Sequence, residues 1–253
     1  YLLWLAEPDQ PVGRERWYIP PELLSTDHHR EVSPGGRFDC GLAHGIPGPL
    51  AALALTWQAG YRYPGLRESI AYLAHWVEAR QINAPWGIDW PGYISVEQAT
   101  SSDDWQRLSP SRPSWCYGAP GVACSLWLAG QALEDERFCL LAIEALEAAL
   151  RRPVTQRFTP SVHLCHGVAG QLQICLRFAH RCESSLIREH ILVLVERILD
   201  AFNPTYALGF RDMDTLPPLD LATWLTGAPG IAMVLLAAST SVVPSWDRAL
   251  AIA

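Results

Sequence analysis

Three side chains that bind soft metal ions lie at two Gly-x-x-Gly turns of this sequence. Cys116 comes two residues before the turn at 118–121, and Cys165 and His166 come directly before the turn at 167–170. Thiolate and imidazole together favour zinc, Zn²⁺, among the common metals of the cell. A catalytic zinc has three protein ligands and an open fourth position, whereas a structural zinc has four protein ligands. If the two turns meet in space, these residues predict an open zinc site.

Two further polar side chains accompany the same kind of turn. His44 directly precedes the turn at 45–48 and is a candidate for proton transfer. Arg112 lies four residues before Cys116 and can steady a developing negative charge. Bound zinc lowers the pKa of a thiol below its usual value of about 8.5, which produces a nucleophile at neutral pH. The residue types therefore indicate thiol chemistry at the rim of a cavity.

Simpler interpretations of these residues stay open. A lone cysteine in an apolar context most often serves as a packing residue, and His44 can equally cap its turn. His163 is an alternative ligand, and a fourth protein ligand would close the site. However, the sequence has no close Cys-x-x-Cys pair of the kind typical of structural zinc. The adjacent Cys165 and His166 lie at a glycine turn rather than inside a helix, which favours a metal-binding role.

The glycine turns open a repeated unit of helices. Each turn precedes a helix that is apolar nearly all round, and three of these are followed by a helix that is apolar on one face. The first kind has to be buried on every side, whereas the second covers the core from outside. The pattern predicts an all-α fold, an α/α toroid that forms a single domain over residues 1–253. We expect inner helices at 50–59, 122–133, 171–182 and 231–238, and outer helices at 66–80, 135–152 and 185–202.

The remaining segments are predicted to be mostly loops. Residues 1–6 resemble the end of a helix, residues 7–36 form a long loop with a helical turn at 22–24, and residues 81–114 form an excursion rich in Trp and Pro. Because the longest of these segments precede glycine turns, we expect the loops to gather at one end of the barrel. That end would carry the candidate site.

Composition excludes several classes of protein. A net charge of -7 argues against a nucleic-acid-binding protein, which would present a basic face. No apolar run reaches the length of about 18 residues that a transmembrane segment needs. The seven cysteines do not form the dense framework of a small disulfide-rich domain, so we expect a cytoplasmic location. With 49% hydrophobic and only 18% charged residues, the chain can bury a large core.

Three motifs together resemble those of the lanthionine synthetase C family, the cyclases of lantibiotic biosynthesis. They occur in the family's order as GLAHGIPG at 41–48, WCYGAPG at 115–121 and LCHGVAG at 164–170. The sequence LTGAPG at 225–230 is similar to the C-terminal end of the family. Tyr117 is typical of the stand-alone bacterial cyclases, since the bifunctional synthetases more often have His there.

The resemblance implies specific roles for these residues. Cys116, Cys165 and His166 would bind zinc, while His44, Arg112 and Tyr117 would line the active site, with His44 as the main acid or base. The implied reaction is addition of a precursor-peptide cysteine thiol to dehydroalanine or dehydrobutyrine, which forms a lanthionine or methyllanthionine thioether ring. The implied partners are the dehydrated precursor peptide, the dehydratase and the export transporter, so that the protein would associate peripherally with a membrane biosynthetic complex.

One feature of the family has no counterpart in the sequence. The family's catalytic Asp belongs to an earlier Gly-rich motif, which we expect upstream of Tyr1, and we do not assign its role to Asp39, Asp212 or Asp214. The chain is accordingly expected to be the C-terminal portion of a cyclase, with its whole metal site.

Alternative functions within the fold are an enzyme that adds glutathione or another thiol to dehydrated residues and a non-catalytic zinc scaffold that binds the peptide. A toroid glycosidase is excluded because it requires paired carboxylates at the turns.

Overall fold

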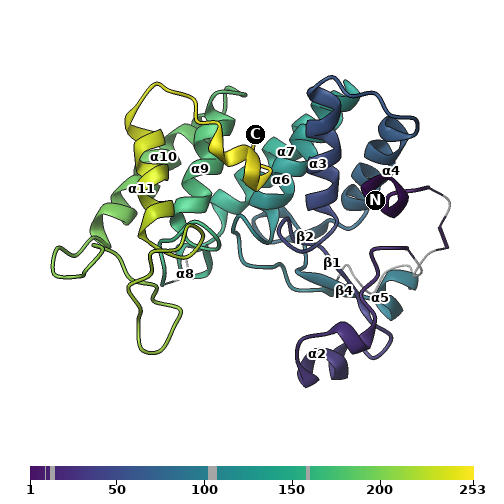
Figure 1. The fold of residues 1–253 in the computed structure, drawn as a ribbon, viewed down its shortest axis with the longest axis horizontal. Coiled ribbons are helices and arrows are strands. Elements are labelled where there is room, and N and C mark those ends of the chain that lie inside the picture. The colour runs from purple at the N-terminus through teal and green to yellow at the C-terminus, as the bar shows by residue number, and fades with distance from the viewer. Residues whose placement is uncertain (9, 12–14, 102–106, 158–159) are drawn as a thin grey trace.

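The computed structural model describes residues 1–8, 10–11, 15–101, 107–157 and 160–253, and it is mostly helical (Figure 1). Residues 9, 12–14 and 102–106 of the predicted loops lie outside the described residues. The helices are α1 (Leu2–Leu5), α2 (Asp27–Val32), α3 (Pro47–Gln58), α4 (Leu66–Glu78), α5 (Val96–Thr100), α6 (Ala119–Leu133), α7 (Glu136–Arg151), α8 (Val154–Arg157), α9 (Val168–Ala179), α10 (Ser185–Asp200) and α11 (Ala228–Ser239), with 3-10 turns η1 (Pro21–Leu23) and η3 (Trp246–Leu250).

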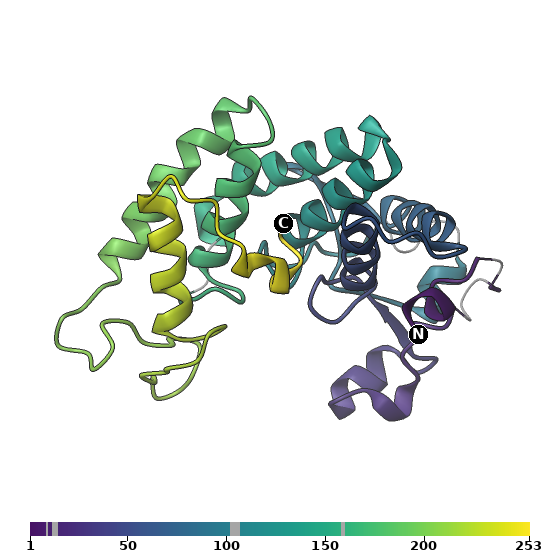
Figure 2. The ribbon, with the colours of Figure 1, turned by 45° about the horizontal axis from the view of Figure 1, so that its top comes forward.

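The predicted inner and outer helices are present as packed pairs. Helix α3 packs on α4, α6 on α7, and α9 on α10, while α6 also contacts α3 and α9, and α9 contacts α11. Every residue of α6 except Gln131 is buried. Helix α7 buries one face, with Phe138, Ala142 and Ala145 inside and Leu140 exposed. Figure 2 shows these pairs side by side, with the C-terminal segment crossing back from α11 to the middle of the molecule. Closure of the helices into a toroid stays a prediction.

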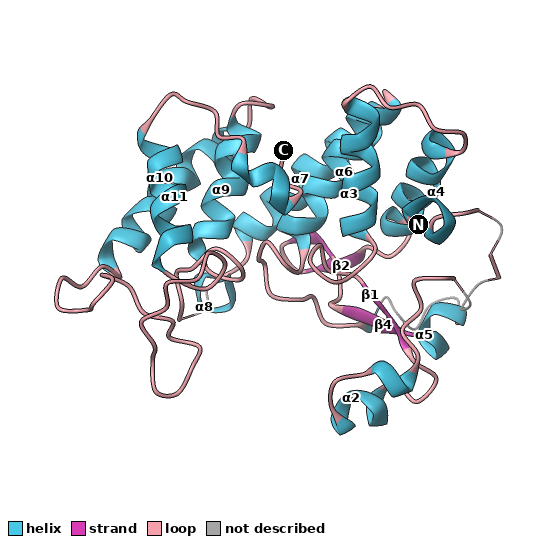
Figure 3. Ribbon diagram, viewed as in Figure 1, coloured by secondary structure: helices cyan, strands magenta, loops and turns pink. Residues whose placement is uncertain are grey.

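Four short strands accompany the helices, and three of them lie within the segment at 81–114 that was predicted to be a loop. Strand β1 (Arg37–Asp39) pairs antiparallel with β4 (Tyr93–Ser95), and β2 (Ile82–Ala84) pairs with β3 (Gly87–Asp89). Each strand has three residues, which is too short for an alternating pattern to be recognised in sequence. The strands and the longest loops lie at one end of the helices (Figure 3), as the position of the glycine turns predicts.

Both glycines of every Gly-x-x-Gly turn lie against a backbone carbonyl six residues earlier. A Cβ on Gly118 would come 2.5 Å from the carbonyl oxygen of Arg112, and a Cβ on Gly48 would come 2.6 Å from that of Leu42. The corresponding distances at the other turn glycines are also below 3.0 Å, closer than a real side chain allows; these glycines are 45, 121, 167, 170, 227 and 230. Glycine is therefore required for each loop to fold back tightly onto the start of its helix.

The core joins all the helix pairs. One cluster of buried apolar side chains extends from Leu5 to Ile252 and includes residues of α3, α4, α6, α7, α9, α10 and α11. Cys124 and Cys175 are fully buried within it, and burial raises the pKa of each thiol to about 12, so these two are packing residues. All seven cysteines are free thiols. In the described part of the chain, no helix has the length and apolar character needed to cross a bilayer.

Candidate metal centre

Backbone hydrogen bonds join equivalent positions of the four glycine turns. Ala43, Cys116, Cys165 and Leu225 each lie two residues before the first glycine of a turn. The amide of Ala43 donates to the carbonyl of Cys116 (3.3 Å), that of Cys116 to Cys165 (3.2 Å), and that of Cys165 to Leu225 (2.8 Å). These bonds hold the turns in a row at the N-terminal ends of α3, α6, α9 and α11. Cys116 and Cys165 are consequently neighbours although they are remote in sequence.

The three predicted ligands lie together. The Sγ atoms of Cys116 and Cys165 and one imidazole nitrogen of His166 are all within 4.8 Å of one another. In a tetrahedral zinc site, with Zn–S of about 2.3 Å and Zn–N of about 2.0 Å, ligand atoms are roughly 3.5 Å apart, so only small side-chain movements are needed. Cys116 is buried, whereas Cys165 and His166 are partly exposed. The donor set therefore fits zinc, with a side open to solvent.

The environment of the cysteine pair favours one thiolate. The pKa of the Cys116 thiol is lowered well below its usual value, chiefly by the hydrogen bond from Cys165 and further by His166 and Ser114. Ser114 Oγ lies 3.4 Å from Cys116 Sγ. The positive charge of Arg112 acts in the same direction, although the Arg112 side chain is exposed. The pKa of Cys165 is raised, first by the hydrogen bond that it shares with Cys116. A thiolate is the form that binds a metal.

Tyr117 and His44, two of the residues expected to line the active site, lie beside this centre. Tyr117 donates its phenolic hydrogen to Asp39 Oδ2 over 2.8 Å, and burial together with Asp39 raises the pKa of the phenol, so Tyr117 is neutral at pH 7. The ring centroids of His44 and Tyr117 are 6.2 Å apart. Sequence reasoning gave Asp39 no role, because the contact depends on a partner far along the chain. The structure thus adds a carboxylate next to Tyr117.

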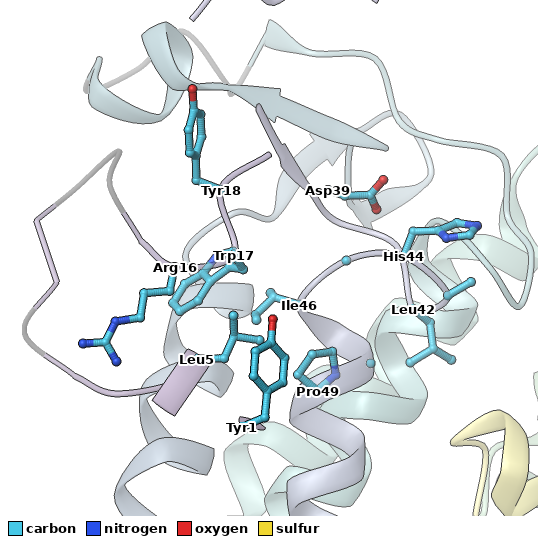
Figure 4. A pocket seen from close by; sticks show the side chains of 13 residues that line it. Tyr1, Leu5, Arg16, Trp17, Tyr18, Asp39, Leu42, His44, Ile46 and Pro49 are labelled. Carbon is cyan, nitrogen blue, oxygen red and sulfur yellow. The ribbon is translucent and has the colours of Figure 1, made fainter. Parts of the chain in front are cut away.

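An open cavity of about 450 Å³ adjoins His44 and Asp39. Figure 4 shows these two side chains near each other toward one side of the cavity, with Tyr1 and Trp17 farther across it. The exposed His44 ring is consequently accessible to a molecule that enters from solvent.

His166 has a second set of neighbours that sequence reasoning did not connect with it. Its Nε2 atom lies 3.0 Å from Asp214 Oδ2, and the ring of His163 packs edge-on against its ring at 4.1 Å between centroids. Within the described residues, His163 does not join the group of Cys116, Cys165 and His166, but belongs to a separate group with His166 and Asp214. Burial is the main cause of a lowered pKa at His163, so its ring is neutral at pH 7.

Comparisons with known proteins agree with the motifs. The family profile described as lanthionine synthetase C-like protein matches residues 18–251. The nisin biosynthesis protein NisC of Lactococcus lactis subsp. lactis is 26% identical over 198 residues, which are 77% of this chain and 47% of NisC. The solved structure of nisin cyclase aligns with a TM-score of 0.76 at 22% identity, over 99% of this chain and 58% of that chain.

The chain therefore spans about half the length of the curated relative that it matches. The structural likeness shows a common fold, and the family profile covers almost the whole sequence. This chain belongs to the lanthionine synthetase C-like family.

Proposed function

We propose that this protein is a zinc-dependent cyclase that forms thioether rings in a dehydrated precursor peptide. The observation that carries the proposal is the convergence of Cys116, Cys165 and His166, whose ligand atoms lie within 4.8 Å of one another at a partly exposed position. Three ligands and an open side are the arrangement of a catalytic zinc. Membership of the lanthionine synthetase C-like family and similarity to the nisin biosynthesis protein NisC support the same reaction.

Zinc would be held by Cys116, Cys165 and His166, and when bound it would stabilise the thiolate form of a substrate cysteine. In the reaction, a bond forms between the thiol sulfur and the β-carbon of dehydroalanine or dehydrobutyrine, and the proton of the thiol finally resides on the α-carbon. His44, which is exposed beside the cavity, is the proposed group that receives and returns that proton.

Arg112 is the candidate partner in this chain for the negative charge that develops on the enolate. It is exposed and acts electrostatically on Cys116, so its charge reaches the centre. Positioned charges of this kind stabilise a developing oxyanion. Tyr117 directly follows Cys116 and gives its only phenolic hydrogen to Asp39, so it orients that carboxylate at the site. The open cavity beside His44 offers space for the segment of peptide that flanks the reacting residues.

The test combines metal content with a count of thiols. We expect the purified protein to bind one zinc ion per chain and Cys116→Ala or Cys165→Ala to abolish binding. Cys182→Ala is the matched control, because Cys182 is also partly buried and its Sγ donates to the backbone carbonyl of Phe178 rather than to a proposed ligand. Zinc retained in both cysteine variants would contradict the ligand assignment.

The activity assay uses a peptide that contains dehydroalanine, dehydrobutyrine and cysteine. Cyclisation removes free thiols without changing the mass of the peptide, whereas addition of glutathione increases the mass. We expect thiols to disappear at constant mass. A protein that holds zinc but leaves the thiols unchanged would instead be a peptide-binding scaffold, and an increase in mass with glutathione present would indicate the intermolecular reaction.

A further inference from the structure

We propose that Asp214 is a positioning residue that orients the His166 imidazole for metal binding. The inference depends on the metal site of the proposed function. An imidazole has two ring nitrogens, and Nε2 of His166 lies 3.0 Å from Asp214 Oδ2. With Nε2 directed to the carboxylate, Nδ1 is the nitrogen left to bind the metal. Asp214 comes from a different segment of the chain, the loop between α10 and α11, so this contact is a tertiary one.

His163 lies against the same Asp214 oxygen. Its side chain is only 2% exposed, and its Nδ1 accepts a hydrogen bond from the backbone amide of His166 at 3.5 Å. A neutral ring that accepts at Nδ1 carries its proton on Nε2. That atom lies 3.3 Å from Asp214 Oδ2 and 3.9 Å from Asp212 Oδ1. The same Asp214 oxygen therefore lies close to the Nε2 atoms of two histidines, which restricts the positions that the carboxylate can adopt.

The loop that carries Asp214 is anchored beside the site. Ser161 Oγ donates to Asp212 Oδ1 at 3.0 Å and accepts from the amides of Met213 at 2.7 Å and of Asp214 at 3.1 Å. Asp212 Oδ1 also accepts from the amide of Asp214. The backbone of Asp212 pairs with that of Leu219 through two hydrogen bonds. Ser161 and Asp212 are both buried. The approach of Asp214 to His166 is thus built from several buried contacts rather than from one surface ion pair.

The chemical consequence is a fixed ligand. A carboxylate that accepts the second N–H of a metal-binding histidine fixes both the tautomer and the ring orientation, and it makes the other nitrogen a better donor. Loss of such a partner typically weakens metal binding by about 10- to 100-fold.

The experiment measures zinc affinity by competition with a chromophoric chelator, using the metal-free chain. We expect Asp214→Asn to weaken zinc binding by about 10- to 100-fold at unchanged stoichiometry. Asp214→Glu should recover part of the loss because it restores the carboxylate. The matched control is Asp220→Asn, which removes a carboxylate of nearly equal exposure (25% against 26%) from the same loop, where it pairs with Arg211. This control should bind zinc within about threefold of the unchanged protein.

A spectroscopic measurement separates orientation from general loosening of the loop. With Co²⁺ in place of zinc, Asp214→Asn should shift the visible ligand-field bands, while Asp220→Asn should not. Equal zinc affinity of Asp214→Asn and the unchanged protein would overturn the inference but leave the proposed metal site intact. Two metal ions per chain, with one lost in Asp214→Asn, would also overturn it, because Asp214 would then be a ligand itself. A chain that binds no zinc at all would contradict both proposals.

Discussion

Replacing Gly118 with alanine should destabilise the fold and the metal centre together. Gly118 has φ +76° and ψ -175°, a conformation that is essentially confined to glycine, and forcing another residue into it costs about 2 kcal/mol. The added Cβ would also lie 2.5 Å from the Arg112 carbonyl oxygen, against an ordinary contact of 3.4 Å or more. Neither the added Cβ nor the Arg112 carbonyl oxygen can move aside by side-chain rotation, because both are attached directly to the backbone. Overlap of this kind costs about 2 kcal/mol.

The two effects add to about 4 kcal/mol for Gly118→Ala. Gly60→Ala is the matched control, since Gly60 also has a positive φ of +92° but no atom of the described residues within 4 Å of the added Cβ. That control should lose only about 1 kcal/mol from backbone strain. Urea denaturation gives the free energy of unfolding of both variants. Because Cys116 lies two residues before Gly118, the same substitution should weaken zinc binding, whereas Gly60→Ala should not affect it.

The reasoning would be refuted if the two alanine variants had free energies of unfolding within about 1 kcal/mol of each other. It would also be refuted if Gly118→Ala bound zinc as tightly as the unchanged protein. Either result would mean that the loop can move away from the Arg112 carbonyl without displacing the ligands.

Three further predictions concern metal, pH and the C-terminal segment. Zinc at 100 times its dissociation constant should stabilise the chain by about 2.7 kcal/mol, so a chelator should lower the melting temperature of the protein but not that of Cys116→Ala. Burial raises the pKa of Asp39, so the folded state binds its proton more tightly than the unfolded state does. The stability of the protein relative to Asp39→Asn should therefore rise as the pH falls from 7 through that raised pKa. Urea midpoints of both proteins at several pH values measure this, and parallel plots of midpoint against pH would contradict it. Arg177→Ala should lower the free energy of unfolding by about 3 to 5 kcal/mol, because it leaves the buried Asp247 carboxylate without its charged partner. Arg177 Nη2 lies 2.6 Å from that carboxylate, which is fully buried. A loss below about 1 kcal/mol would show that other groups compensate.

The helices were predictable because their periodicity is local. The expected inner helix at 122–133 corresponds to α6, and the outer helix at 135–152 corresponds to α7, with ends that differ by a few residues. Three short helices, α2, α5 and α8, were missed, although the sequence contains capping signals for the first two. Thr26 accepts from the amide of His29 at the start of α2, and Ser95 forms a capping box with Gln98 at the start of α5.

The candidate site was predictable only where a motif carries it. Cys116, Cys165 and His166 each adjoin a glycine turn, and the structure brings their ligand atoms together. The contacts of Asp39 with Tyr117 and of Asp214 with His166 could not be predicted, because each joins segments that are remote along the chain. Local sequence patterns identify helices and turns, but they do not identify which distant side chain a carboxylate contacts. Their roles required the tertiary arrangement of the turns.

The row of backbone hydrogen bonds that links Ala43, Cys116, Cys165 and Leu225 has an evolutionary consequence. Amide and carbonyl groups make these bonds, so the alignment is independent of which side chains the four positions carry. Two positions carry sulfur and two do not, although all four share one geometry. A lineage could therefore gain, lose or relocate a ligand by a single codon change without remodelling the scaffold. Ala43→Cys, next to Cys116 in the row, is the direct laboratory equivalent of such a step.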